Sequence, residues 1–384
     1  MNTNFSSWSS LLFLLFWSGL LNNLSAQSDT TRRWERMLTR FLREDRPVDR
    51  PRLLLYPTLA YTPETSLEIG VATALLFHAK NDAVNNRLSE LTAFGFVTLR
   101  SQYGLWVDNA VYTDQDKWLI LGRVRLHRFP LLYYGIGSET APDNPDVVDG
   151  YGVIVRERLF RQLRKNVFGG LQFDYQSLSR VEFGADDISV RPRPLGAQGS
   201  ANLGLGLGIA YDSRPNALNT RDGWFAELGW LRYDPTWGSQ YTFDNYNADV
   251  RWYKSLRTRQ VFAAQFVGNV VSGSAPFNQL SLLGNESMMR GYYTGRFRDQ
   301  QYYALQAEYR WLPFSFSKRI GGAVFGGAGA VTPQLSALSV DQVRLAGGAG
   351  LRFLLFAKKD IFLRVDLGVT REGTGFYIYT GEAF

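Results

Sequence analysis

The chain of 384 residues contains no cysteine. Disulfide bonds, thiolate metal sites and cysteine catalysis are therefore excluded, and the absence suits an oxidising compartment, where free thiols are a liability. Histidine is also scarce, since only His78 and His127 are present. The sequence has neither a Gly-x-Ser-x-Gly elbow nor a metal-ligand spacing. These absences predict a protein that is not an enzyme and that uses no cofactor or metal.

Charged residues are missing from the first 26 positions. Within that stretch, the apolar run from Leu11 to Leu21 has the length of a signal-peptide core and is too short to span a bilayer. Ser25 and Ala26 are small residues that offer a cleavage position before Gln27. We expect residues 1–26 to be a signal peptide; a buried N-terminal helix is the alternative.

An amphipathic helix is predicted within residues 29–45. Its apolar side chains recur at helical spacing and the other side is mostly arginine. Pro47 and Pro51 would end it, because proline lacks the amide donor and clashes with the preceding turn. Residues 27–52 are then a periplasmic helix and linker, and the helix either packs on the main domain or lies in a membrane interface.

The formal net charge is +7 and the isoelectric point is near 9.4. Lysine and arginine alternate with apolar residues instead of forming a groove-binding stripe, so we expect no nucleic-acid partner. Outer-membrane lipids with anionic phosphates are the favoured partner. Four basic turns predict a periplasmic rim that holds such phosphates, or are ordinary solvated turns: 161–165, 255–260, 317–319 and 357–359.

From residue 53 to residue 384 the pattern repeats every two residues, as in β-strands. In the stretch 301–311, Leu305 and Tyr309 share one face, whereas Glu308 and Arg310 share the other. In the stretch 361–369, Arg364 and Asp366 lie opposite an entirely apolar face. Each predicted strand thus has one apolar and one charged face.

Three features favour a membrane barrel over a soluble sandwich. The strands recur over the whole region, aromatic residues gather at their ends, and no uncharged run after residue 26 resembles a spanning helix. The sequence therefore predicts an all-β fold, a transmembrane antiparallel β-barrel over 53–384 in the bacterial outer membrane. Sixteen strands are expected, or twelve or fourteen if neighbours merge; they begin near residues 53, 66, 90, 103, 117, 149, 167, 200, 222, 242, 261, 301, 320, 343, 361 and 374.

Several stretches resemble the BamA/TamA superfamily of outer-membrane assembly and translocation barrels, the bacterial surface antigen family. They are GLGIAYDSRPNALNTRDGWFAELGW (206–230), LLGNESMMRGYYTGRFRDQQYYALQAEYRW (282–311), VFGGAG (324–329), GAGLRF (348–353) and GFYIYTGEAF (375–384). About 25 residues separate the predicted signal peptide from the barrel. The chain is therefore similar to the short branch of the family that lacks periplasmic polypeptide-transport-associated domains.

The resemblance implies that the loop with Arg290, Gly291 and Tyr292 folds back into the lumen. A buried guanidinium needs a carboxylate, and Glu308 and Asp366 face inward by parity. The family often has an acid where this chain has Gly327, so Glu308 or Asp366 must compensate. Gly291 would permit a tight turn, and Tyr292 can stack and donate a hydrogen bond.

Two further groups of residues stand out, a charged turn with a structural role and the C-terminal residue. Asp212, Arg214 and Asp222, with Arg221 beside them, could form a charge network that locks a periplasmic turn. Phe384, at the end of an alternating strand, resembles a C-terminal signal that would make this barrel a client of an assembly machine.

A seam is expected where the first and last strands meet, between residues 54–58 and 377–381, the second ending at Gly381. Pro57 cannot donate a hydrogen bond to a ladder, so this seam should be weakly bonded. In the family the seam opens, and a client strand adds by β-augmentation. The chain is thus expected to insert or translocate protein or lipid, with a client barrel or exported polypeptide as partner; the alternative is a passive pore or a membrane-perturbing scaffold.

Overall fold

The computed structural model describes residues 50–62, 66–99, 101–128, 130–183, 192–217, 219–357 and 360–384. The predicted signal peptide and the predicted helix within 29–45 lie outside the described residues. The described residues belong to one compact unit, Pro47–Phe384. No helix among them is long and apolar enough to cross a membrane.

The described part of the chain contains one antiparallel sheet of seventeen strands, sixteen of them eight residues or longer. Each long strand pairs with the next one along the sequence. The long strands are β1 (Arg52–Thr62), β2 (Ser66–His78), β3 (Leu88–Thr98), β4 (Tyr103–Tyr112), β5 (Trp118–Arg128), β7 (Asp146–Arg164), β8 (Val167–Phe183), β9 (Ser200–Asp212), β10 (Gly223–Tyr233), β11 (Phe243–Arg257), β12 (Gln260–Gly273), β15 (Gln301–Trp311), β16 (Ile320–Thr332), β17 (Arg344–Phe356), β18 (Ile361–Thr370) and β19 (Gly373–Thr380). The prediction of about sixteen strands is confirmed, and each start lies within three residues of its predicted position.

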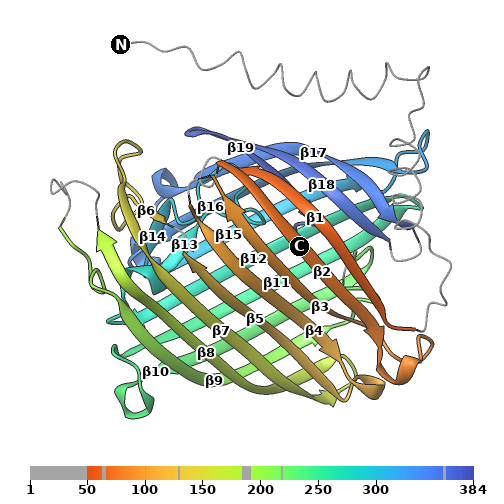
Figure 1. The fold of residues 1–384 in the computed structure, drawn as a ribbon, viewed down its shortest axis with the longest axis horizontal. Coiled ribbons are helices and arrows are strands. Elements are labelled where there is room, and N and C mark those ends of the chain that lie inside the picture. Colours follow the sequence, from red (N-terminus) through yellow and green to blue (C-terminus); the bar gives the residue numbers. More distant parts are fainter. Residues whose placement is uncertain are drawn as a thin grey trace, which may run out of the picture. The chain divides into compact units, whose positions relative to one another are not determined.

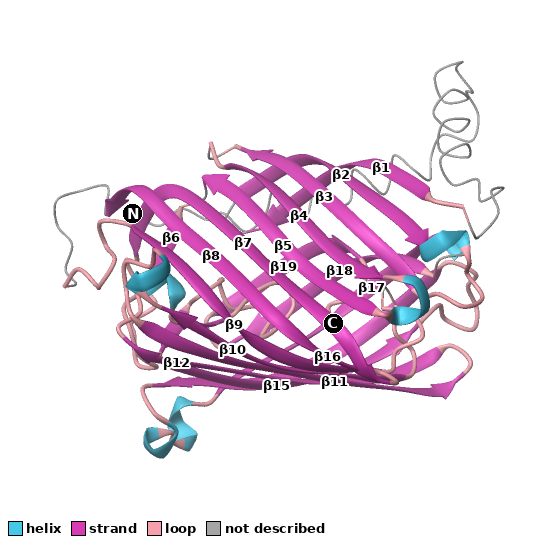
Figure 2. Ribbon diagram, turned by 90° about the horizontal axis from the view of Figure 1, so that it is seen from below, coloured by secondary structure: helices cyan, strands magenta, loops and turns pink. Residues whose placement is uncertain are grey.

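The sheet curls into a barrel, which Figures 1 and 2 show from two directions. Side chains alternate between its outside and its interior. On β15 Leu305 is 59% exposed whereas Glu308 is 1% exposed, and on β18 Leu367 is 48% exposed whereas Asp366 is fully buried. The apolar face of each strand thus points outward and the charged face points inward, as a lipid-facing barrel requires.

The remaining elements are short and lie in the connections. Strand β6 (Leu131–Tyr133) pairs with β7, and β13 (Ser281–Leu283) pairs with β14 (Phe297–Asp299) inside the connection from β12 to β15. The described helices are single 3₁₀ turns: η1 (Ala79–Asn81), η2 (Asp114–Asp116), η3 (Pro235–Trp237), η4 (Phe277–Gln279), η5 (Leu335–Ala337) and η6 (Val340–Gln342). The buried apolar cluster of the connection from β12 to β15 also includes side chains of β15, β16 and β17, so this connection fills part of the interior.

The first and last strands meet differently from all other neighbours. β1 and β19 lie side by side, but no ladder pair joins them among the described residues, whereas β1 is paired with β2 along its whole length. Pro57 lies on the exposed face of β1, opposite Val71 of β2. The junction between β1 and β19 therefore lacks the ladder that joins every other pair of neighbouring long strands in the described part of the chain.

The prediction that Phe384 ends an alternating strand is wrong. Strand β19 ends at Thr380, and Gly381 turns the chain with a φ of +90°. Phe384 is 9% exposed and packs inside the barrel beside Tyr253. The physical reason is that the residues after Gly381 make favourable contacts inside the barrel. Glu382 forms an ion pair with Arg352, and the Phe384 ring is buried away from water.

Candidate functional site

The loop between β13 and β14 presents its central arginine to the interior of the barrel. Asn285 begins the turn, because its Oδ1 accepts hydrogen bonds from the backbone N–H groups of Ser287 (2.8 Å) and Met288 (2.7 Å). Met288 and Met289 are 4% and 1% exposed and pack in the apolar cluster that holds the loop. The two methionines thus anchor the loop, and Arg290 follows at its tip.

Arg290 binds both acids that were selected from strand parity. Its Nη1 donates to Asp366 Oδ2 on β18 and its Nη2 donates to Glu308 Oε2 on β15, each at 2.5 Å. The guanidinium carbon lies 3.4 Å from the centre of the Phe325 ring on β16, which adds a cation–π contact. All three charged side chains are fully buried, so the loop is tied to strands β15, β16 and β18.

Three further arginines join this cluster, and the sequence analysis did not select them. Arg310 and Arg352 donate to Glu308 Oε1 at 3.0 and 2.9 Å. Arg352 and Arg364 donate to the two oxygens of Asp366 at 2.6 and 3.2 Å. Parity already placed Arg310 and Arg364 beside the two acids, two residues away on the same strands, and this was the available signal.

Glu382 supplies a third carboxylate to the cluster from the segment after β19. It accepts hydrogen bonds from Arg352 Nε at 2.9 and 3.1 Å and lies 3.6 Å from Arg310. Arg310 also donates to the backbone oxygen of Phe384 at 3.1 Å and lies 4.9 Å from the ring centre. Four guanidinium groups therefore share three carboxylates, and they connect the loop, β15, β17, β18 and the segment after β19.

Gly291 lets the loop approach β18 closely. Its φ of +111° disfavours other residues, and a Cβ atom here would lie 2.7 Å from Thr370 Cγ2. Its N–H donates to Tyr377 Oη on β19 at 2.9 Å. Tyr292 packs against Phe297 and donates from its hydroxyl to the Leu345 carbonyl at 3.2 Å.

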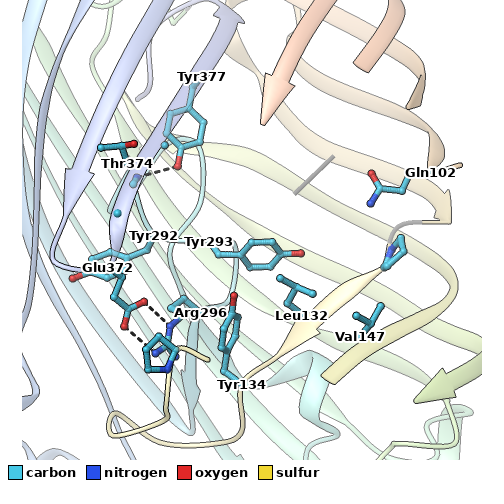
Figure 3. A pocket seen from close by; sticks show the side chains of 15 residues that line it. Gln102, Leu132, Tyr134, Val147, Tyr292, Tyr293, Arg296, Glu372, Thr374 and Tyr377 are labelled. Atoms are coloured by element: carbon cyan, nitrogen blue, oxygen red, sulfur yellow. Dashed lines mark hydrogen bonds and ion pairs between the residues drawn. The ribbon is translucent and has the colours of Figure 1, made fainter. Parts of the chain in front are cut away.

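A cavity of about 480 Å³ separates part of this loop from the first residues of β19. Figure 3 shows Tyr134, Tyr292 and Tyr293 around it, with Tyr377 above them. Arg296 clamps its lower edge by binding both oxygens of Glu372 at 2.5 and 2.8 Å. Besides the bond from Arg290 to Asp366, the loop is therefore also attached to the β18–β19 hairpin through Gly291 and Arg296.

The residues predicted to form one charge network in a periplasmic turn bind separate partners in the structure. Asp212 is fully buried and binds Arg214 at 2.9 Å, Arg87 at 3.5 Å and the hydroxyl of Tyr112 at 2.8 Å. The first two predicted members thus meet, together with two residues that sequence analysis did not select.

Asp222, the third predicted member, lies elsewhere. It accepts a hydrogen bond from the Ser255 N–H at 3.1 Å and lies 3.8 Å from Lys254. Hydrogen bonds from Ser255 lower the pKa of its carboxyl group. Arg221 instead binds Asp360 in the connection from β17 to β18, at 2.7 and 2.8 Å. The turn is thus linked to a connection far away in the sequence.

Residues 109–355 match the Omp85 superfamily domain. The chain belongs to the Omp85 superfamily. The family resemblance found in the sequence is therefore confirmed, and this Omp85 chain is a bacterial outer-membrane barrel related to assembly and translocation proteins. Barrels of this family are transport and assembly proteins and are not enzymes.

Solved structures show the same fold. The barrel is similar to BamA from Haemophilus ducreyi lacking POTRA domains 1–3, with a TM-score of 0.53 and 14% identity over 86% of this chain and 69% of that one. It is also similar to CdiB from Acinetobacter baumannii (TM-score 0.54, 13% identity, 85% of this chain and 59% of that one) and to CdiB from Escherichia coli (0.53, 10%, 85% and 61%). The chain thus spans about three fifths of the CdiB chains. A comparison with curated proteins finds no match.

Proposed function

We propose that this Omp85 barrel inserts or translocates protein through the seam between β1 and β19. One observation carries the proposal: the two strands lie side by side without ladder pairs among the described residues. An unpaired strand edge is a template for another extended segment. A client barrel strand or an exported polypeptide would bind there by β-augmentation.

The cluster of four arginines and three carboxylates around Arg290 makes the β19 side of the seam rigid, and this supports the proposal. Arg290 ties the loop to β15 and β18, and the Gly291 N–H ties it to β19 through Tyr377. On the other side of the seam, β1 is held by its ladder with β2. Opening at the seam would therefore cost fewer hydrogen bonds than opening at any other junction between long strands.

A disulfide lock tests this function in the naturally cysteine-free background. One cysteine is placed among residues 54–58 and one among residues 377–381, and cell-surface export or client-barrel assembly is measured with and without reductant. We expect activity to disappear when the seam is locked and to return on reduction, because a client strand needs access to the edges of β1 and β19.

The matched control is a lock within an ordinary ladder. Leu53 and Leu75 face each other across β1 and β2, so cysteines there join two strands that stay together in any case. This variant should keep full activity under oxidising conditions. Full activity with the seam locked would contradict the proposal.

A passive pore is the second candidate, and the cavity of about 890 Å³ inside the barrel favours it. A pore predicts a large, steady conductance in planar bilayers that does not change when the seam is locked. Loops pack against the interior strands near the cavity, however, and such packing narrows a passage. We therefore rank the pore below the seam.

A further inference from the structure

Arginine side chains are concentrated in the lining of the large cavity inside the barrel. It has a volume of about 890 Å³, and its described lining includes seven arginines and five carboxylates. Arg290, Glu308 and Asp366 do not line it, so the cavity is distinct from the charge cluster that holds the loop. Asp174 and Asp212, which lie outside this lining, pair with Arg156 and Arg214, so the pairing of each arginine has to be followed one by one.

Two of the arginines bind both oxygens of a carboxylate. Arg125 Nη2 donates to both oxygens of Asp108 at 2.7 and 2.8 Å. Arg158 Nη1 donates to both oxygens of Glu227 at 2.9 and 2.7 Å. These pairs neutralise their own charge and leave no free carboxylate for a neighbour.

Among the arginines that line this cavity, Arg123 on β5 lacks a close carboxylate partner. It forms no hydrogen bond with any described residue; the nearest carboxylate oxygen, Asp108 Oδ1, is 3.9 Å from its Nε and is already held by Arg125. Directly across the ladder stands Arg156 of β7, another cation on the same inward face. Like charges in directly opposite positions destabilise a strand pair.

Arg156 does not relieve this repulsion. Its Nη2 binds Asp174, which also accepts the hydroxyl of Tyr233, and its Nε is buried without a partner among the described residues. The side chains of Arg123 and Arg156 remain 51% and 36% exposed. Because both line the cavity, this exposure is toward the interior of the barrel, and a ligand there can reach both guanidinium groups.

The second unmatched arginine is Arg298 of β14, which also lines the cavity. It is 3% exposed, and its Nη2 donates only to the carbonyls of Leu132 and Gly295. Its Nε has no partner among the described residues. A buried guanidinium without a carboxylate is costly unless an anion compensates it.

We propose that the wall around Arg123 and Arg156 binds a small oxyanion, a phosphate or a carboxylate, within the cavity. A guanidinium offers a planar set of donors that matches the oxygens of such a group, and two adjacent guanidiniums match its charge. Asn245 and Asn247 of β11 add amide groups to the same cavity. This site is independent of the seam and would persist if the seam were locked.

Titration with inorganic phosphate tests the site directly. The protein is placed in nanodiscs of phosphatidylcholine, and phosphate binding is measured by calorimetry for the wild type and for Arg123→Gln. We expect saturable binding that weakens about tenfold in the variant, as for the loss of one hydrogen bond to a charged group. Arg123→Lys, which keeps the charge and loses the planar donors, should fall between the two.

Arg371→Gln is the matched control, because Arg371 is an exposed arginine in the turn from β18 to β19 that does not line the cavity and lies in none of the four basic turns. It should bind phosphate like the wild type. A second arm repeats the titration with phosphatidylglycerol in the nanodisc. Retention of that lipid by the wild type and not by Arg123→Gln, without a response to inorganic phosphate, would assign the oxyanion site to a lipid headgroup. No phosphate or lipid binding, or equal binding by all variants, would overturn the proposal.

Discussion

Two buried arginines from the same connection have opposite surroundings. Arg290 is paired with two carboxylates, whereas Arg298 meets carbonyl groups and the rings of Tyr133 and Phe277. Burial lowers the pKa of Arg298 to about 10, yet the side chain stays cationic at neutral pH. Arg290 thus stabilises its surroundings, and Arg298 is retained at a cost.

This contrast predicts different effects of the same substitution. Arg290→Met removes one partner from each of two buried carboxylates, Glu308 and Asp366. We expect it to lower the free energy of unfolding by about 3 kcal/mol. Arg298→Met strands no carboxylate, so its unfolding free energy should stay within about 1 kcal/mol of the wild type. Urea unfolding in detergent, followed by tryptophan fluorescence, measures both; equal losses would contradict the assignment.

At the scale of elements, the loop and β18 are in backbone contact. A Cβ atom on Gly291 would press on Thr370, and one on Gly368 would lie 2.6 Å from the Arg290 carbonyl carbon. Glycine is therefore needed on both sides of this contact. The approach explains how a short loop can deliver Arg290 to acids on two different strands.

Gly291→Ala should detach the loop from β18, because the added methyl group adds roughly 1–3 kcal/mol of strain. We expect limited proteolysis within 284–296 to become faster while the barrel stays folded. Gly295→Ala is the control: Gly295 also has a positive φ, +71°, but its nearest Cβ contact would be an ordinary 3.4 Å. Equal protease sensitivity of the two variants would show that backbone strain, and not contact with β18, controls the loop.

The turn between β9 and β10 shows how far an element can be predicted. Its acids and arginines were recognised from their density in 211–223, and Asp212 does bind Arg214. Arg221 binds Asp360 instead of Asp222, because Asp360 lies in another connection that the fold brings close. Local density identifies a charged turn, but it cannot choose partners from distant connections.

At the scale of the whole molecule, the segment after β19 links the seam to the charge cluster. Glu382 binds Arg352 of β17, and the Phe384 carbonyl binds Arg310 of β15. Strand β19 is only eight residues long and has one ladder partner, β18, among the described residues. Its attachment to the barrel therefore depends partly on contacts made by the residues that follow it.

Glu382→Gln should loosen β19 and leave the rest of the sheet unchanged. Losing a hydrogen-bonded charge predicts amide hydrogen exchange about tenfold faster in β19, with β7 and β8 unaffected. Glu139→Gln serves as the control, since the Glu139 side chain is 75% exposed in its pair with Arg344 and such pairs contribute little. Unchanged exchange in β19 would mean that its ladder with β18 holds it alone.

The alternation of side chains was sufficient to predict the barrel class, the outer-membrane location and strand starts within three residues. Alternation is a local property that each strand carries in its own residues, so it can be read without the fold. Parity likewise selected Glu308 and Asp366 as candidate partners of Arg290. Tertiary structure alone decided that Arg310 and Arg352 also bind Glu308, and that Glu382 joins them as a third carboxylate. It also decided that Arg123 lies opposite Arg156 and that the chain turns inward at Gly381. These outcomes depend on strand register and on the way the sheet curls, which are set by contacts between residues far apart in the chain.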